Sequence, residues 1–197
     1  MKRICKCLLM LIAMLVMTCS VAFAEEKIGI VLEAPLDFCN DAEVQSLIDT
    51  KASSLFPKDR FKVMSTKDSV EAAANYRKNN KMSDVIGEGR GGYTMPMRKD
   101  NVKAFGESIG ANYVLFFKLS NDAPKYGTGF YSTSVKANII CEIRVMNVAK
   151  DMFTVNKQIV EKGKSTAVYA GLPSFNHAYK YAFTKALQML TLDVDAM

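Results

Sequence analysis

The feature that most constrains this fold is a long run of alternating apolar and polar residues in the second half of the chain. Between Ser134 and Met146 every second residue is apolar, namely Val135, Ala137, Ile139, Cys141, Ile143 and Val145. Such alternation places those side chains on one face of a β-strand. A turn at 147–152 and a second strand-like run, Phe153–Lys164, follow. The two runs predict a long antiparallel hairpin with one buried face.

Three shorter strands and four helices are expected around this hairpin. Apolar, β-branched runs predict strands at 27–33, 60–65 and 112–119. Helical spacing of apolar residues predicts helices at 41–56, 65–78 and 100–109. A last helix is expected to begin at Ser174, which is a suitable N-cap. Its apolar stripe is expected to contain Phe175, Ala178, Ala182, Ala186 and Met189.

This order of elements predicts an α/β fold, leaning toward α+β, with a single mixed sheet of about five strands. Early strands that alternate with helices favour parallel pairing, and the late hairpin adds antiparallel strands. Helices should pack on the sheet. The stretches 80–98 and 121–133 are expected to be irregular connections. No internal repeat or linker divides residues 25–197, so we expect one domain there.

The first 24 residues have the pattern of a secretory signal peptide. Lys2, Arg3 and Lys6 precede an uncharged apolar run at 8–17, and Ala22-Phe23-Ala24 forms a small-residue cleavage motif. The apolar run is shorter than the roughly 20 residues of a spanning helix. We therefore expect cleavage near Ala24 and a periplasmic or otherwise extracytoplasmic location. Lipidation of Cys19 stays open, although Met17-Thr18 is a poor sequence before a lipidated cysteine.

Charge and cysteine content narrow the classes of partner. The formal net charge is +6, and the signal peptide contributes half of it, so no nucleic-acid partner is expected. Cys39 and Cys141 remain after cleavage. Two interpretations stay open for this pair: a disulfide in an oxidising compartment, or a buried Cys141 thiol within its strand.

Motifs for catalysis, cofactors and metals were sought, and each match lacks its context. Residues 87–92 satisfy G-x-G-x-x-G, but Tyr93 to Pro96 cannot open the helix that a dinucleotide site needs. Gly163-Lys164-Ser165 resembles the end of a phosphate loop, yet Gln158 stands where that loop requires glycine. His177 is the sole histidine. We therefore predict no catalytic, cofactor-binding or metal-binding residues and no enzyme.

Two irregular stretches contain candidate contact residues for a partner. One mixes basic and apolar side chains, Arg90, Tyr93 and Met95, and the other contains Tyr126, Phe130 and Tyr131. Exposed aromatic residues among small polar ones are typical of protein interfaces. The alternative is that Phe130 and Tyr131 fold back on the sheet.

The segment from Ala104 to Leu115, AFGESIGANYVL, resembles a helix–Gly-Ala-Asp/Asn-Tyr-Val-Leu–strand signature of bacterial envelope proteins. The group includes the curli-secretion CsgG family, the penicillin-binding-protein activator LpoB and the N-terminal domain of TolB. The opening strand at Ile28–Val31, the long hairpin and the closing amphipathic helix also match the group in order.

The resemblance implies a non-enzymatic role in the envelope through docking to another envelope protein. Peripheral membrane contact and self-association stay open. The channel-forming members of the group insert extra membrane strands, whereas 80–98 and 121–133 lack alternating segments of about 10 residues. We therefore predict a periplasmic protein-binding adaptor. The alternatives are a subunit of an oligomeric secretion channel and a small-ligand-binding domain.

Overall fold

The structure is a computed structural model that describes residues 25–82, 85–86, 92–168 and 171–197. The signal peptide, Cys19 and Arg90 lie outside these residues. The chain forms a mixed α/β fold around a six-stranded sheet with the path β2-β1-β5-β7-β6, and β8 pairs with the other edge of β7. The strands are β1 (Glu26–Glu33), β2 (Phe61–Val63), β5 (Tyr113–Asn121), β6 (Lys125–Thr128), β7 (Ser132–Asn147) and β8 (Met152–Val168).

Pairing directions agree with the expectation from the sequence. β1 is parallel to both β2 and β5, and β7 is antiparallel to β5 and to β8. β5 and β6 pair with successive parts of β7, so β6 continues the line of β5. The sheet is thus five strands wide.

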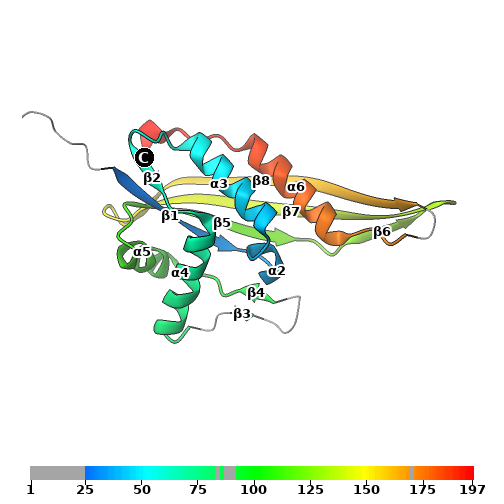
Figure 1. Cartoon of the computed structure of the whole chain (residues 1–197), viewed down its shortest axis with the longest axis horizontal. Coiled ribbons are helices and arrows are strands. Elements are labelled where there is room, and N and C mark those ends of the chain that lie inside the picture. The colour runs from blue at the N-terminus through cyan, green and yellow to red at the C-terminus, as the bar shows by residue number, and fades with distance from the viewer. Residues whose placement is uncertain (1–24, 83–84, 87–91, 169–170) are drawn as a thin grey trace, which may run out of the picture.

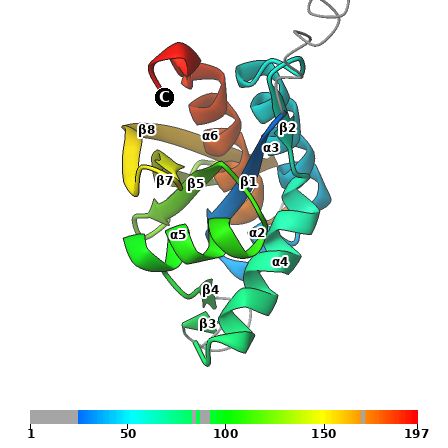
Figure 2. The same ribbon diagram turned by 90° about the vertical axis from the view of Figure 1, so that its left-hand side faces the viewer.

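Helices cover both faces of the sheet at one end. The helices are α2 (Leu36–Cys39), α3 (Ala42–Leu55), α4 (Thr66–Asn79), α5 (Lys99–Ser108) and α6 (Phe175–Met189), with a 3-10 turn, η2 (Val194–Ala196). α3 and α6 lie on one face and α4 and α5 on the other, as Figures 1 and 2 show. None of these helices is long and apolar enough to cross a bilayer, within the described part of the chain.

Side-chain caps begin three of the helices where the sequence places them. The Asp41 carboxylate accepts hydrogen bonds from the backbone N–H groups of α3, and the Ser65 and Ser174 hydroxyls do so for α4 and α6. Gly110 follows α5 with a φ of +63°, a conformation that suits glycine. Local sequence therefore fixes these helix ends.

The larger core lies under α3 and α6. It contains all six alternating residues of β7 from Val135 to Val145, and each of them is fully buried. The predicted buried face of the hairpin is confirmed. On the opposite face, α4 and α5 cover Val31, Val114 and Met146, with Phe105 of α5 packed against them.

Several local expectations were wrong. The 121–133 stretch contains β6, and 80–98 contains β3 (Val85–Ile86) and β4 (Tyr93–Thr94), which form a small antiparallel pair. These strands are short and are held by tertiary pairing, so alternation does not mark them. Met189 is 62% exposed and does not belong to the buried stripe of α6, where Tyr179 and Phe183 contribute the large side chains.

Candidate functional site

The β6–β7–β8 region extends beyond the helices and forms the far end of the molecule (Figure 1). β6 pairs with β7 from Lys125 opposite Lys136 to Thr128 opposite Thr133. The tight connection between them is closed by the Gly129 N–H, which donates to the Ser132 carbonyl oxygen at 2.7 Å. All residues from 122 to 131 are exposed. A backbone ladder therefore supports this end while its side chains stay free for contact.

Three aromatic side chains lie exposed on this protruding end. Phe130 is 90% exposed, and Tyr126 and Tyr131 are each 71% exposed. The Phe130 and Tyr131 rings pack edge to face with centroids 4.6 Å apart. Neither ring folds back on the sheet, so both rings are accessible from solvent. Two more exposed apolar residues, Val168 and Leu172, belong to the neighbouring end of β8 and the segment after it.

Three lysines stand in one row across the strands beside these aromatics. Lys125 of β6 is directly opposite Lys136 of β7, and Lys136 is directly opposite Lys164 of β8. All three are exposed. Directly opposed residues in an antiparallel pair point to the same face with Cβ atoms about 5 Å apart. The three ammonium groups therefore share one small patch of the sheet face that α4 and α5 leave open.

None of the described acidic side chains forms an ion pair with this row, and Asp122, near Lys125 in the sequence, instead accepts a hydrogen bond from Asn138. The sequence contains no Asp or Glu from 123 to 141 or from 162 to 192. None of the ion pairs found among the described residues involves Lys125, Lys136 or Lys164. Like charges directly opposite one another destabilise a sheet. The arrangement is thus unfavourable for the isolated domain and favourable for an anionic partner.

Replacing the central lysine should stabilise the protein. In a Lys136→Glu variant, both opposing lysines gain an opposite charge, so we expect the free energy of unfolding to rise by about 0.5–1 kcal/mol. Urea unfolding at low salt measures this change, and added salt should reduce it. Lys58→Glu, in the exposed turn before β2, is the control and should give no gain. A loss of stability in Lys136→Glu would show that repulsion among the three lysines does not destabilise the folded protein.

Tyr93 and Met95, the described residues of the other predicted contact group, lie elsewhere. Tyr93 of β4 is half-buried, and its hydroxyl donates a hydrogen bond to the Asn121 side-chain oxygen at the end of β5. The Met95 carbonyl oxygen accepts a hydrogen bond from the buried Arg77 Nε at 3.2 Å. Asn121 pairs with Ile139, well inside β7, and is roughly 20 Å from Phe130 and Tyr131 at the usual strand rise. Tyr93 and Met95 therefore do not form one surface with these two rings.

The two cysteines are free thiols buried in the larger core. The Cys39 sulfur donates weakly to the Leu32 and Ala34 carbonyl oxygens, at 3.8 and 3.6 Å. Burial raises the pKa of both thiols to about 12. The structure therefore contains neither a bridge between them nor a reactive thiolate.

Residues 87–91 of the G-x-G-x-x-G match lie outside the described residues, and the other two features lie in regular structure. Gly163, Lys164 and Ser165 lie within β8, where no phosphate loop forms. His177 is an exposed residue in the first turn of α6. Among the described residues, no three His, Cys, Asp or Glu side chains come together as a metal site.

Comparison with solved structures finds distant likenesses in outline. The LpoB C-terminal domain from Salmonella enterica aligns with a TM-score of 0.35 and 11% identity, covering 74% of this chain and 88% of that one. Lipoprotein GNA1162 from Neisseria meningitidis aligns with a TM-score of 0.40 and 10% identity, over 81% and 95%. The hypothetical protein CT253 from Chlamydia trachomatis aligns with a TM-score of 0.39 and 9% identity, covering 84% of this chain and 92% of that one.

No family model matches the chain, and no curated protein matches it either.

Proposed function

We propose that this protein is an exported, non-enzymatic accessory factor that docks onto another envelope protein through the end of its long hairpin. We call this part of the molecule the hairpin end. It is defined by Phe130 and Tyr131 at its turn, the row of Lys125, Lys136 and Lys164 on one face of the sheet, and Tyr126 on the other face. The observation that carries the proposal is the placement of exposed aromatics beside like charges that have no ion-pair partner among the described residues.

The aromatic residues supply the anchoring part of such an interface. Tyrosine and phenylalanine bury large areas for little side-chain entropy, and aromatic residues are frequent among the few that dominate binding energy. The Phe130–Tyr131 edge-to-face pair fixes both rings relative to each other before binding. A partner pocket that accepts this pair would therefore meet a preorganised surface.

The lysine row defines the charge of the partner. Its repulsion is relieved when carboxylates of another protein approach, so binding an acidic surface gains energy that the free domain lacks. Long-range attraction of this kind also raises the association rate and weakens as salt increases. We therefore expect an acidic partner and salt-dependent binding. Export of the mature chain 25–197 as one domain is part of the proposal.

In-cell photo-crosslinking tests the proposal. The full chain would carry a tag and a photoreactive residue in place of Ser132, beside the aromatic pair, and captured proteins would be identified by mass spectrometry. We expect one discrete envelope protein. Its capture should fall at least about tenfold in Tyr126→Ser/Phe130→Ser/Tyr131→Ser, because each anchor contributes on the order of 1–2 kcal/mol. Lys125→Glu/Lys136→Glu/Lys164→Glu should also reduce it.

The matched control is Tyr181→Ser, which removes an exposed tyrosine of α6, a helix on the face of the sheet opposite to the lysine row. Capture should persist in that variant, and urea unfolding should show that all variants fold. Equal capture by the triple aromatic variant would refute the hairpin end as the docking surface. A ladder of self-crosslinked species in the membrane fraction would instead support a secretion-channel subunit. Crosslinks to lipid alone would replace the protein partner with the membrane.

A further inference from the structure

A cavity of about 400 Å³ opens at the edge of the sheet where the parallel strands β1 and β5 end. The chain leaves β1 through α3 on one face and reaches β5 through α4 and α5 on the other face. The connection from β1 to β2 therefore crosses one face of the sheet, and the connection from β2 to β5 crosses the other face. In open α/β sheets, ligands bind outside the carboxyl ends of the strands at such a switch point. The position alone makes the cavity a candidate ligand site.

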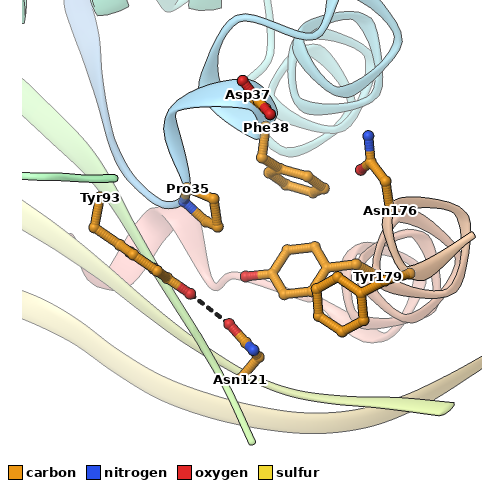
Figure 3. Close-up of a pocket in the computed structure, with 8 residues that line it drawn as sticks. Pro35, Asp37, Phe38, Tyr93, Asn121, Asn176 and Tyr179 are labelled. Atoms are coloured by element: carbon orange, nitrogen blue, oxygen red, sulfur yellow. Dashed lines mark hydrogen bonds between the residues drawn. The ribbon is translucent and has the colours of Figure 1, made fainter. Parts of the chain in front are cut away.

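The cavity wall combines apolar rings with a few polar groups (Figure 3). Pro35 and Phe38 come from the segment after β1, and Phe175 and Tyr179 from the first turns of α6. The half-buried Pro35 and Phe175 side chains leave apolar surface open to a ligand. The volume lies in the range of natural small-molecule sites, which pair such walls with a few orienting polar groups.

Two phenol hydroxyls and an amide converge at the base of the cavity. The Tyr93 hydroxyl donates to Asn121, so its oxygen keeps lone pairs that can accept a hydrogen bond. The Tyr179 side chain is 2% exposed, and its hydroxyl points toward the Tyr93–Asn121 pair (Figure 3). Burial raises the pKa of Tyr93, and a side-chain contact with the Tyr179 hydroxyl opposes that shift. However, the Tyr179 hydroxyl makes no hydrogen bond of normal geometry within the described residues.

A buried hydroxyl without a well-formed hydrogen bond destabilises the free protein. Burial also raises the pKa of Tyr179, so the group stays a neutral donor. A ligand hydroxyl that reaches both phenols from the cavity can accept from Tyr179 and donate to Tyr93. One alcohol group would thereby satisfy both tyrosines.

The charge of the lining decides the class of ligand. Among the described residues that line the cavity none is Lys or Arg, and the exposed Asp37 at the rim is the only charged one. An anionic ligand would therefore meet repulsion. The buried Phe38 and Tyr179 rings pack edge to face with centroids 4.8 Å apart, so they do not present the open faces that a cation needs. Phenols, amides and a carboxylate together suit a neutral molecule with several hydroxyls.

We propose that this cavity binds a neutral sugar ring, whose hydroxyl bridges Tyr93 and Tyr179 and whose apolar face packs on Pro35 and Phe175. Asn176 and Asp37 at the rim accept further sugar hydroxyls. The site is separate from the hairpin end, so the two functions can fail independently.

The test is an NMR titration of the isotope-labelled protein, purified after export from an expression host. The probes are methyl glucoside and N-acetylglucosamine, with glucose 6-phosphate and choline as charged comparators. We expect both neutral sugars to shift the backbone amide signals of Phe38, Tyr93, Asn121 and Asn176. Tyr179→Phe keeps the ring and should weaken binding about fivefold or more, the effect of one hydrogen bond. Its melting temperature should not fall, because the hydroxyl has no partner to lose.

Tyr181→Phe removes the hydroxyl of an exposed tyrosine two residues further along α6 and should bind the sugars like the parent protein. Absence of these shifts with both neutral sugars would overturn the proposal. Unchanged affinity in Tyr179→Phe would also overturn it. Tighter binding of choline or glucose 6-phosphate would reject the neutral class. The hairpin-end variants should retain sugar binding, which separates this result from failure of the docking proposal.

Discussion

A Gly163→Ala substitution is expected to lower the free energy of unfolding by about 3 kcal/mol or more. Gly163 is buried in β8 where α6 crosses the sheet. A Cβ atom on Gly163 would lie 1.8 Å from the Ala178 carbonyl oxygen and 3.0 Å from the Ala182 backbone nitrogen. Both atoms belong to the helix backbone, so no side-chain rotation can make room. The whole of α6 would have to move away from the sheet.

The size of the effect follows from what α6 covers. Ala178, Ala182 and Ala186 are fully buried, and their small side chains allow the helix backbone to approach the strands closely. On the same helix, Phe183 packs against Phe38 and Phe117 with ring centroids 5.2 and 6.5 Å apart. Even a small displacement of α6 away from the sheet loosens this dense core.

Urea unfolding of the two variants Gly163→Ala and Gly127→Ala gives a direct comparison. Gly127 also lies in a strand, β6, but a Cβ atom there would meet only the Ser134 hydroxyl oxygen, at 3.1 Å. We expect a change within about 0.5 kcal/mol for Gly127→Ala. Equal effects at both glycines would show that strand propensity, and not helix packing, determines the stability at Gly163.

Much of this fold could be predicted because its signals are local. The alternation in β7 identified its buried face, and the capping residues Asp41, Ser65 and Ser174 placed three helix starts. Pairing directions followed from the order of strands and helices. These features depend on residues close together in the sequence, so inspection of the sequence could find them.

The features that could not be predicted from the sequence depend on contacts between residues far apart in the chain. β6 has exposed side chains and is defined by its pairing with β7, so no hydrophobic pattern marks it. The lysine row can be recognised only once the register of three strands is known, although each lysine is visible in the sequence. Likewise, the cavity joins Tyr93, Asn121 and Tyr179 from three separate segments. Gly163 was dismissed correctly as a phosphate loop residue, but its packing role appears only once α6 is placed.

Glu33, the last residue of β1, should make the protein less stable as the pH rises. Its side chain points to the face covered by α4 and α5, and the residue is 4% exposed. One carboxyl oxygen accepts a hydrogen bond from the Met97 N–H. Burial raises the pKa of Glu33 to about 7, although the Met97 N–H and the charge of Arg77 act against the shift. The folded state therefore binds a proton that the unfolded state has released above its ordinary pKa of 4.5.

A carboxyl group whose pKa is raised in the folded protein stabilises the fold fully at a pH below its unfolded-state pKa. This stabilisation is lost as the pH rises through its folded-state pKa. The loss here falls between about pH 4.5 and 7 and amounts to about 2–3 kcal/mol. Glu33→Gln keeps an oxygen that can accept from Met97 and cannot ionise. We therefore expect this variant to be more stable than the parent protein by about that amount at pH 8, and similar to it near pH 4.5.

Urea unfolding of the parent protein and Glu33→Gln between pH 4.5 and 8 measures the difference directly. Glu71→Gln makes the same chemical change at an exposed position of α4, so its difference from the parent protein should stay small across the range. Because the two substitutions alter net charge equally, a gain that grows with pH only in Glu33→Gln must come from the buried carboxyl. A gain that does not change with pH would mean that Glu33 is already ionised in the folded state at pH 4.5. Its neighbours Arg77, Lys118 and Arg144 would then outweigh its burial.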